Sequence, residues 1–132
     1  MNTIVSTPNL SDQFDQEVNI VQPLFNHYGG LKQGYGKIIT IDCFEDNSLV
    51  SEQVQLPGEG RILVIDGGGS LLYSLLGDQL TEKAIDNGWS AILINGSLRD
   101  VEIIASMPLV VLALASIPRK TVKAGKGSLN VP

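Results

Sequence analysis

Residues 61–70 read Arg-Ile-Leu-Val-Ile-Asp-Gly-Gly-Gly-Ser, an apolar run that leads straight into three glycines. Such a run is typical of a strand that is buried on both faces, as in a parallel sheet. From Ser70 to Ile85, apolar residues recur at helical spacing, and a second buried run follows at residues 91–94. Strand, helix and strand in this order predict a right-handed crossover between parallel strands, and therefore an α/β fold with a central sheet.

The rest of the chain supplies further elements around this crossover. β-branched residues predict a strand within residues 35–44, and residues 109–115 form another run of the buried-strand type. Asn47 is expected to cap a short helix that runs to Val54, and Asp100 a shorter one over residues 101–106. A weak helical pattern covers residues 12–25, and the tail from Pro118 is expected to be a basic loop.

Composition limits the possible classes of protein. The chain has 132 residues, 43% hydrophobic and 17% charged, which fits a single globular domain over residues 1–132. Its net charge of −5 argues against a broad nucleic-acid-binding surface, because such surfaces depend on clustered Lys and Arg. The apolar runs are too short to span a membrane, and residues 1–13 carry no targeting signal, so a cytoplasmic protein is expected.

Cys43 is the only cysteine and His27 the only histidine. An intrachain disulfide and a zinc site built on cysteines or a histidine pair are therefore excluded. We interpret Cys43 as a small buried hydrophobe and assign no role to His27.

Two glycine positions each leave two interpretations open. The glycines of residues 67–69 lie between a strand and a helix, where backbone N–H groups can cradle an anion or where glycine simply allows close packing. Gly77 interrupts a leucine-rich segment, and a glycine inside a helix costs about 1 kcal/mol relative to alanine.

At Gly77, a helix could break and restart, leaving free N–H groups that suit a carboxylate. Those groups belong to Gly77, Asp78, Gln79 and Leu80. The other interpretation is one continuous helix with a glycine for close packing, and periodicity alone favours it.

Arg99 and Asp100 follow the second buried strand and a glycine turn. The carboxyl ends of strands are where open α/β sheets bind their ligands. Arginine offers a fork of donors for a carboxylate or keto acid, and aspartate offers hard oxygen to Mg²⁺ or Mn²⁺. Taken alone, the two residues also fit an ordinary surface ion pair, which contributes little to stability.

Several words of the sequence together resemble one family. They are residues 64–70 (Val-Ile-Asp-Gly-Gly-Gly-Ser), 87–89 (Asn-Gly-Trp), 96–101 (Gly-Ser-Leu-Arg-Asp-Val) and 117–120 (Ile-Pro-Arg-Lys). In these words the chain resembles the class II 4-hydroxy-4-methyl-2-oxoglutarate aldolases, which group with the regulator of ribonuclease E activity A (RraA) proteins. The most specific element is an acid, twenty residues and then Arg-Asp, which Asp78, Arg99 and Asp100 match.

The resemblance implies a single compact β/β/α swivelling-type domain and a role for each matched residue. It implies that Arg99 binds the pyruvyl substrate, that Asp100 holds Mg²⁺ or Mn²⁺ largely through water, and that Asp78 orients or deprotonates a water. The backbone from Gly77 to Leu80 would hold the substrate carboxylate. The implied activities are retro-aldol cleavage to pyruvate and oxaloacetate decarboxylation, without a lysine Schiff base, in a homotrimer.

Two features depart from the aldolase pattern. Residues 15–25 and 43–47 are more similar to the ribonuclease-regulator branch, which implies a noncatalytic protein that binds and inhibits ribonuclease E as the alternative function. The family also continues past the position of Pro132 into closing strands, so this RraA-like domain is expected to lack those C-terminal strands.

Overall fold

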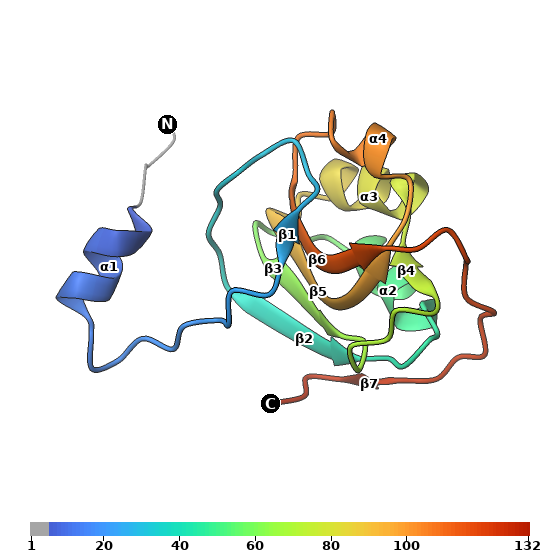
Figure 1. The fold of residues 1–132 in the computed structure, drawn as a ribbon, viewed down its shortest axis with the longest axis horizontal. Helices are drawn as coiled ribbons and strands as arrows, with labels where there is room; N and C mark the ends of the chain where they lie inside the picture. Colours follow the sequence, from blue (N-terminus) through green and yellow to red (C-terminus); the bar gives the residue numbers. More distant parts are fainter. Residues whose placement is uncertain (1–5) are drawn as a thin grey trace.

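A computed structural model describes residues 6–132 and contains one mixed sheet with short helices beside it (Figure 1). Residues 1–5, part of the segment expected to carry no targeting signal, lie outside the described residues. The strands are β1 (Asn26–His27), β2 (Ile38–Asp42), β3 (Ile62–Asp66), β4 (Ser74–Leu76), β5 (Ala91–Leu98), β6 (Val110–Ser116) and β7 (Ser128–Leu129). They run in the order β1, β6, β5, β3, β2 and β7, and β4 pairs with β5 beside this row.

The middle of the sheet is parallel and in register. Ile62 of β3 pairs with both Ile38 of β2 and Ala91 of β5, and Ala91 pairs with Val110 of β6. The strands at the two ends of the row, β1 and β7, are antiparallel. The predicted α/β fold with a parallel crossover is therefore confirmed. The carboxyl ends of the parallel strands lie together along one end of the sheet.

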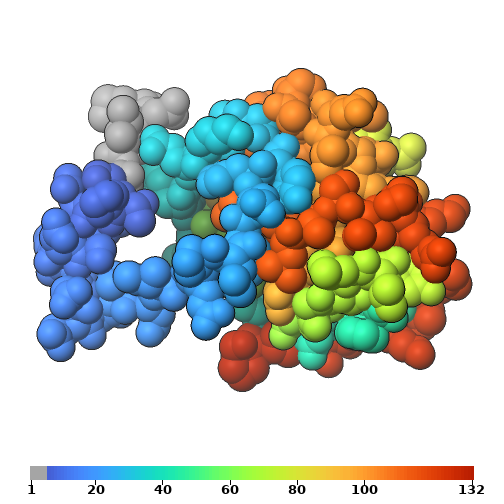
Figure 2. Space-filling model, in the orientation of Figure 1, coloured from blue at the N-terminus to red at the C-terminus, as the bar shows by residue number. Residues whose placement is uncertain are grey.

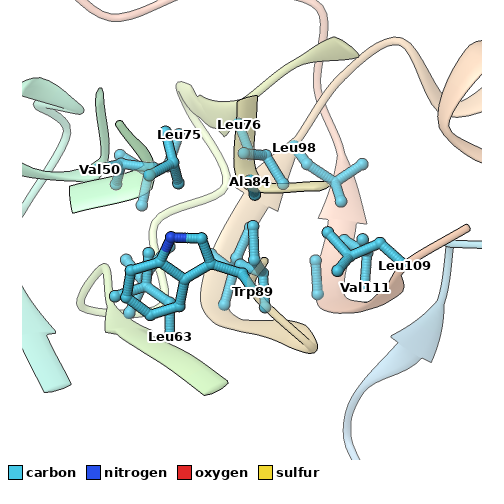
Figure 3. Packing of buried hydrophobic residues seen from close by; sticks show 14 of the residues in the cluster. Val50, Leu63, Leu75, Leu76, Ala84, Trp89, Leu98, Leu109 and Val111 are labelled. Carbon is cyan, nitrogen blue, oxygen red and sulfur yellow. The ribbon is translucent and has the colours of Figure 1, made fainter. Parts of the chain in front are cut away.

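Within the described residues the helices are α1 (Thr7–Gln13), α2 (Ser48–Val54), α3 (Asp78–Asp86) and α4 (Val101–Ile104). α3 contacts both α2 and α4. The core between helices and sheet is almost entirely aliphatic, as the buried-strand runs predicted (Figure 3). Its one tryptophan, Trp89, donates its Nε1–H to the carbonyl oxygen of Leu56 at 3.1 Å, which satisfies the polar atom of a buried ring.

The helix expected from Ser70 is wrong in its first half. Residues 74–76 form β4, which lies beside the end of β5, and the helix begins only at Asp78. Leu71 and Leu72, which completed the helical pattern, are 52% and 64% exposed. Leu75 and Leu76 are buried, so a strand pairing with a distant part of the chain overrides the local helical spacing.

β5 also runs further than expected, through the predicted turn at Asn95 and Gly96 to Leu98. Its pairing with β6 shifts register between Ile94 and Ser97, so the glycine marks an irregularity within a strand. The longer strand carries Arg99 up to β4, where the Arg99 N–H donates to the carbonyl oxygen of Leu76 at 2.9 Å.

Asn47 and Asp100 occupy the N-cap positions of α2 and α4, as expected, but neither side chain caps its helix. The Asn47 side chain accepts a hydrogen bond from the hydroxyl of Thr121, and the Asp100 carboxylate accepts one from the N–H of Asp78. Both side chains therefore connect distant parts of the chain at the carboxyl ends of the parallel strands.

The N-terminal helix lies earlier than the weak pattern over residues 12–25 predicted. α1 begins after Ser6, whose hydroxyl accepts the Asn9 N–H, and it ends at Gln13; none of its residues is buried. Residues 6–25 form an arm beside the body (Figure 2). No helix among the described residues is long and apolar enough to cross a membrane.

The tail is a loop as far as Gly127, as predicted, but then forms the unexpected strand β7 against β2. The Asn130 N–H donates to the carbonyl oxygen of Thr40 at 2.7 Å, and the Thr40 hydroxyl donates to the carbonyl oxygen of Val131. β7 thus pairs with β2 and covers that edge strand of the sheet.

Candidate active site

A pocket of about 350 Å³ lies where β4, β5 and α3 meet. The structure brings the predicted site residues together in its lining, although they come from two separate parts of the chain. These residues are Gly77, Asp78, Gln79, Leu80, Arg99 and Asp100. The twenty-residue spacing between Asp78 and Arg99 thus corresponds to α3 and β5, which bring the chain back to the same place.

Hydrogen bonds join the two halves of the pocket, and a salt bridge links two neighbouring residues within one half. The Asp78 N–H donates to Asp100 Oδ2 at 3.1 Å. The same oxygen lies 3.8 Å from Arg99 Nε, and both side chains are partly exposed to the pocket. Asp100 therefore holds the first turn of α3 and orients the arginine next to it.

Gly77 is required by close approach rather than by its backbone angles. Its φ of −129° and ψ of −171° are extended values that any residue adopts. A Cβ at this position would lie 2.8 Å from Asp100 Oδ2 and 3.5 Å from Arg99 Nε. The glycine thus leaves room for the site, and the interpretation of a continuous helix through Gly77 is wrong, because α3 begins directly after it.

The start of α3 leaves backbone donors free toward the pocket. The N–H of Asp78 is taken by Asp100, and the Thr81 N–H bonds to the carbonyl oxygen of Gly77. Among the described residues, no hydrogen bond occupies the N–H groups of Gln79 and Leu80. Two of the predicted carboxylate-binding groups are therefore available, at the positive end of the helix dipole.

Asp100 has a strained backbone, with φ of 59° and ψ of 37° in the left-handed region. This conformation costs a non-glycine residue on the order of 1 kcal/mol, although aspartate tolerates it better than most. The strain places the carboxylate against the N–H of Asp78 instead of over its own helix. Strained residues of this kind cluster at functional sites.

The carboxylates of the pocket could supply only some of the ligands that a hard cation needs. Asp78 and Asp100 are the acids in the pocket lining, and the described residues contain no group of three or more metal-binding side chains. Mg²⁺ retains several waters and often takes only one or two protein carboxylates, with the remaining ligands from substrate. The residues present therefore fit Mg²⁺ or Mn²⁺ bound jointly with an oxygen-rich ligand.

Sequence reasoning assigned no role to three further cations in the lining. Lys83, Lys120 and Lys123 join Arg99 there, so this pocket holds four of the nine Lys and Arg residues of a chain whose net charge is −5. Lys120 lies in the word Ile-Pro-Arg-Lys that carried part of the resemblance, which is the signal that could have found it. This concentration of positive charge makes the pocket suited to an anion.

The glycines of residues 67–69 are not an anion cradle. The N–H groups of Gly67 and Gly69 donate to the carbonyl oxygen of Asn95, and that of Gly68 donates to Asp66 Oδ1 at 2.9 Å. Gly68 and Gly69 have φ of +67° and +72°, and a Cβ on Gly67 would lie 2.6 Å from Leu75. The close-packing interpretation is therefore the correct one.

Cys43 and His27 lie outside the pocket lining. Burial, together with the nearby charges of Asp42, Asp46 and Asp66, raises the pKa of Cys43 to about 12. The thiol therefore stays protonated, as expected for a buried hydrophobe. His27 lies exposed in β1.

The fold and the pocket together define an α/β domain whose pocket lies at the carboxyl ends of the sheet strands. The pocket is rich in Lys and Arg and also contains carboxylates. The family model RraA-like, described as Aldolase/RraA, matches residues 7–132, and the chain belongs to this family. The family resemblance read from the sequence words is thereby confirmed.

Curated relatives carry an aldolase name. A protein of Ectopseudomonas mendocina (strain ymp) named "Putative 4-hydroxy-4-methyl-2-oxoglutarate aldolase" is 57% identical over 126 residues, covering 96% of this chain and 78% of that protein. One of the same name from Pseudomonas fluorescens (strain Pf0-1) is 53% identical, covering 96% and 77%.

Solved structures share the fold closely. One titled as the RNA-processing inhibitor RraA from Thermus thermophilis has a TM-score of 0.95 and 38% identity, covering 98% of this chain and 79% of that one. Another, from Geobacillus kaustophilus HTA426, is titled as an S-adenosylmethionine: 2-dimethylmenaquinone methyltransferase and has a TM-score of 0.94 and 40% identity, covering 96% and 79%. The structural neighbours therefore carry names of different function classes on one fold.

Proposed function

We propose that this chain is a divalent-metal-dependent aldolase that cleaves 4-hydroxy-4-methyl-2-oxoglutarate to two molecules of pyruvate and also decarboxylates oxaloacetate. The observation that carries the proposal is the meeting of Gly77 and Asp78 with Arg99 and Asp100 in one cation-rich pocket. The names of the relatives at 57% and 53% identity support the same reaction class.

Substrate binding falls to Arg99 and the start of α3. The guanidinium of Arg99 offers two parallel donors to the carboxylate and keto oxygens of a 2-oxo acid. The free N–H groups of Gln79 and Leu80 are suited to the same carboxylate. Together these groups fix the plane of the carboxylate and keto group, and the bond from C3 to C4 must turn perpendicular to that plane for cleavage to give an enolate.

Cleavage of that bond leaves an enolate, whose negative charge must be stabilised. Arg99 places a permanent positive charge beside the enolate oxygen. A divalent cation held by Asp100 would supply Lewis acidity at the keto oxygen. Asp100 is suited to that task because its carboxylate is partly exposed and is fixed by the N–H of Asp78.

Asp78 is the acid available to accept a proton. Retro-aldol cleavage requires removal of the proton from the hydroxyl group at C4, directly or through a water molecule. Asp78 lines the pocket as the first residue of α3, and its side chain is the second carboxylate there. We assign it the role of orienting and deprotonating that water.

The test is release of pyruvate from 4-hydroxy-4-methyl-2-oxoglutarate by the purified chain with Mg²⁺ or Mn²⁺. We expect turnover well above that of the metal alone and its loss on chelation with EDTA. Turnover no faster than metal alone, in protein whose folding is verified by circular dichroism, would exclude the proposal.

The second candidate is a noncatalytic regulator that binds and inhibits ribonuclease E. The specific observation in its favour is the likeness, at 38% identity, to a structure titled as an RNA-processing inhibitor. The net charge of −5 suits association with a basic protein surface. A pull-down with ribonuclease E at low and high salt tests it, and absence of salt-sensitive association would count against it.

A methyltransferase function receives no support from the pocket. S-adenosylmethionine carries a positive sulfonium centre, and the pocket lining holds four cations against two carboxylates. Like charges would disfavour that cofactor, so the name of the Geobacillus structure is not carried over to this chain.

We further propose that the protein assembles as a homotrimer in the cytoplasm. The arm of residues 6–25 supports self-association, since Ile20 and Leu24 on it are 79% and 61% exposed. No hydrogen bond connects this arm to the remainder of the described chain. Light scattering should give three times the chain mass of 14.1 kDa, and an Ile20→Ser, Leu24→Ser variant should dissociate. A wild-type mass of one chain would contradict assembly.

A further inference from the structure

Ser74 of β4 differs from the other buried hydroxyl residues of the chain. In the described part of the chain, the buried residues with a hydroxyl group are Ser74, Thr81, Ser97 and Thr121. Thr81, Ser97 and Thr121 each donate to a protein oxygen, at 2.7, 3.0 and 2.8 Å respectively. The hydroxyl of Ser74 makes no hydrogen bond to any described residue, so its donor and acceptor positions remain available.

This hydroxyl reaches the pocket. Ser74 is only 3% exposed, and every fully buried polar side-chain atom of the described residues has a hydrogen-bond partner. Because the Ser74 hydroxyl has none, it must hold part of that small exposed area, and Ser74 is a lining residue of the pocket. A hydroxyl so deeply buried is stabilised when a molecule in the pocket supplies its partner.

Backbone contacts hold Ser74 in place from both sides. On one side it pairs with Ser97 of β5. On the other side its N–H donates to the carbonyl oxygen of Arg119 at 2.7 Å, and it forms an isolated parallel bridge with Lys120. The hydroxyl therefore sits on a rigid element, which favours a precise contact with a ligand.

The segment that bonds to Ser74, residues 119–126, is itself held by Asp46. This residue is 3% exposed, and its Oδ2 accepts the N–H groups of Ala124 and Lys126 at 2.9 and 3.0 Å. Its Oδ1 accepts the N–H and hydroxyl of Ser48 at 2.9 and 2.6 Å. Burial acts to raise the pKa of Asp46, but these four hydrogen bonds outweigh it and hold the pKa well below its usual value. Asp46 thus stays charged at neutral pH and fixes the support of Ser74.

The place of Ser74 along β4 sets which part of a ligand it can reach. Ser74 precedes Gly77 by three residues, a stretch of extended chain that spans at most about 10 Å. One hydrogen bond of about 3 Å at each end leaves about 4 Å for the ligand, which the carbon chain from C1 to C4 of a 2-oxo acid fills. A ligand whose carboxylate lies at the start of α3 therefore brings its C4 to Ser74.

We propose that the Ser74 hydroxyl donates a hydrogen bond to the C4 hydroxyl oxygen of a 4-hydroxy-2-oxo acid, and so selects such ligands over 2-oxo acids that lack this hydroxyl. The proposal rests on the proposed function for its choice of ligand. A serine hydroxyl suits a neutral hydroxyl, because each group both donates and accepts.

This contact is compatible with bond cleavage. With Ser74 as the donor, the proton of the C4 hydroxyl remains free to leave toward the water at Asp78. As the bond from C3 to C4 breaks, its electron pair passes to the enolate, and the C4 oxygen becomes the keto oxygen of the departing pyruvate. Ser74 keeps its own proton throughout, so it is a specificity-determining residue and not an acid or a base.

The test compares two probes, 4-hydroxy-2-oxobutyrate and 2-oxobutyrate, by titration calorimetry in the presence of Mg²⁺. The two probes differ only in the C4 hydroxyl. We expect the wild-type chain to bind the hydroxylated probe about fivefold more tightly, the scale of one neutral hydrogen bond. In Ser74→Ala this ratio should fall to near one, because the hydroxylated probe loses its partner.

Ser97→Ala is the matched control. Ser97 pairs with Ser74 and is also buried, but its hydroxyl donates to the carbonyl oxygen of Ser70 and it lies outside the pocket lining. This variant loses a structural hydrogen bond, so its stability should fall while its binding ratio equals that of wild type.

A kinetic ratio gives a second measurement. Oxaloacetate has no C4 hydroxyl, whereas 4-hydroxy-4-methyl-2-oxoglutarate has one. In Ser74→Ala, kcat/KM for cleavage of 4-hydroxy-4-methyl-2-oxoglutarate should therefore fall about fivefold relative to kcat/KM for oxaloacetate decarboxylation.

A binding ratio near one in wild type, or a ratio that Ser74→Ala leaves unchanged, would overturn the proposal, even in a chain that releases pyruvate. A chain that prefers the hydroxylated probe through Ser74 but releases no pyruvate would contradict the aldolase assignment and leave the role of Ser74 in place. A folded chain that binds neither probe would contradict both.

Discussion

The backbone N–H of Asp78 donates to Oδ2 of Asp100 at 3.1 Å, which joins the first residue of α3 to the residue that follows Arg99. Two segments that are twenty residues apart in sequence therefore share one carboxylate. That carboxylate also lies 3.8 Å from Arg99 Nε. Any change that moves Asp100 should consequently disturb the helix start and the arginine together.

Gly77→Ala should disrupt this junction. The added Cβ would lie 2.8 Å from Asp100 Oδ2, closer than real Cβ atoms approach, so the carboxylate must move. We expect pyruvate formation to fall at least tenfold, the scale of a misplaced reacting group. Gly34→Ala is a matched control because its Cβ would meet the Val110 side chain at 3.3 Å and the Ser90 carbonyl oxygen at 3.6 Å, both beyond 3.0 Å. Equal activity of the two variants would contradict the role given to Gly77.

Asp100→Asn should separate stability from activity. Asparagine tolerates the left-handed backbone at φ of 59° and keeps an oxygen for the N–H of Asp78. The free energy of unfolding should change by less than about 1 kcal/mol. Metal-dependent pyruvate formation should be lost, because the amide removes the charge that binds the cation. Full activity in this variant would exclude Asp100 as the metal-binding residue.

Asp46 should make stability depend on pH in the acid range. Its folded-state pKa is lowered, so its contribution is complete above the unfolded carboxyl pKa of about 3.9 and is lost as the pH falls further. Asp46→Asn should cost about 2 kcal/mol at pH 7, the scale of several buried hydrogen bonds to a charged group. Urea unfolding should show this difference shrinking at pH 3. A difference that grows with acidification would contradict the assignment.

Cys43 should be unreactive in the folded protein. Burial and three nearby acids raise the pKa of its thiol to about 12, so almost no thiolate exists at neutral pH. A thiol reagent such as DTNB should leave almost all of the native chain unmodified over hours. In denaturant it should modify one thiol per chain promptly. Rapid labelling of the native chain would show that this position is open.

The parallel sheet was predictable because the local sequence pattern of its strands identifies them. The aliphatic runs that became β3, β5 and β6 are short and bounded by turn residues, which is typical of strands, although many of their residues alternate between buried and half-buried, so these strands are not fully buried on both faces as predicted. β4 was not predictable in this way. Leu71, Leu72, Leu75 and Leu76 match a helical period, yet the pairing of Ser74 with Ser97 decides the structure, and no local pattern encodes it.

The residues of the candidate site likewise divide into those that the sequence identified and those that only the tertiary structure brings into place. The acid and the Arg-Asp pair were found through the spacing that the family shares, whereas local chemistry alone favoured a continuous helix and a surface ion pair. Lys120 was identified only in the basic tail and in the word Ile-Pro-Arg-Lys, with no place in the site, because its approach to Ser74 depends on the path of the chain after β6. Contacts of this kind follow from tertiary structure, which residue periodicity does not report.

The most direct test of the central claim is the rate of pyruvate formation from 4-hydroxy-4-methyl-2-oxoglutarate by wild type and by Arg99→Ala, with Mg²⁺ in excess. We expect measurable turnover in wild type and a loss of at least 100-fold in the variant, the scale expected for removing a transition-state charge contact. Retention of the wild-type rate by a folded Arg99→Ala chain would contradict that claim.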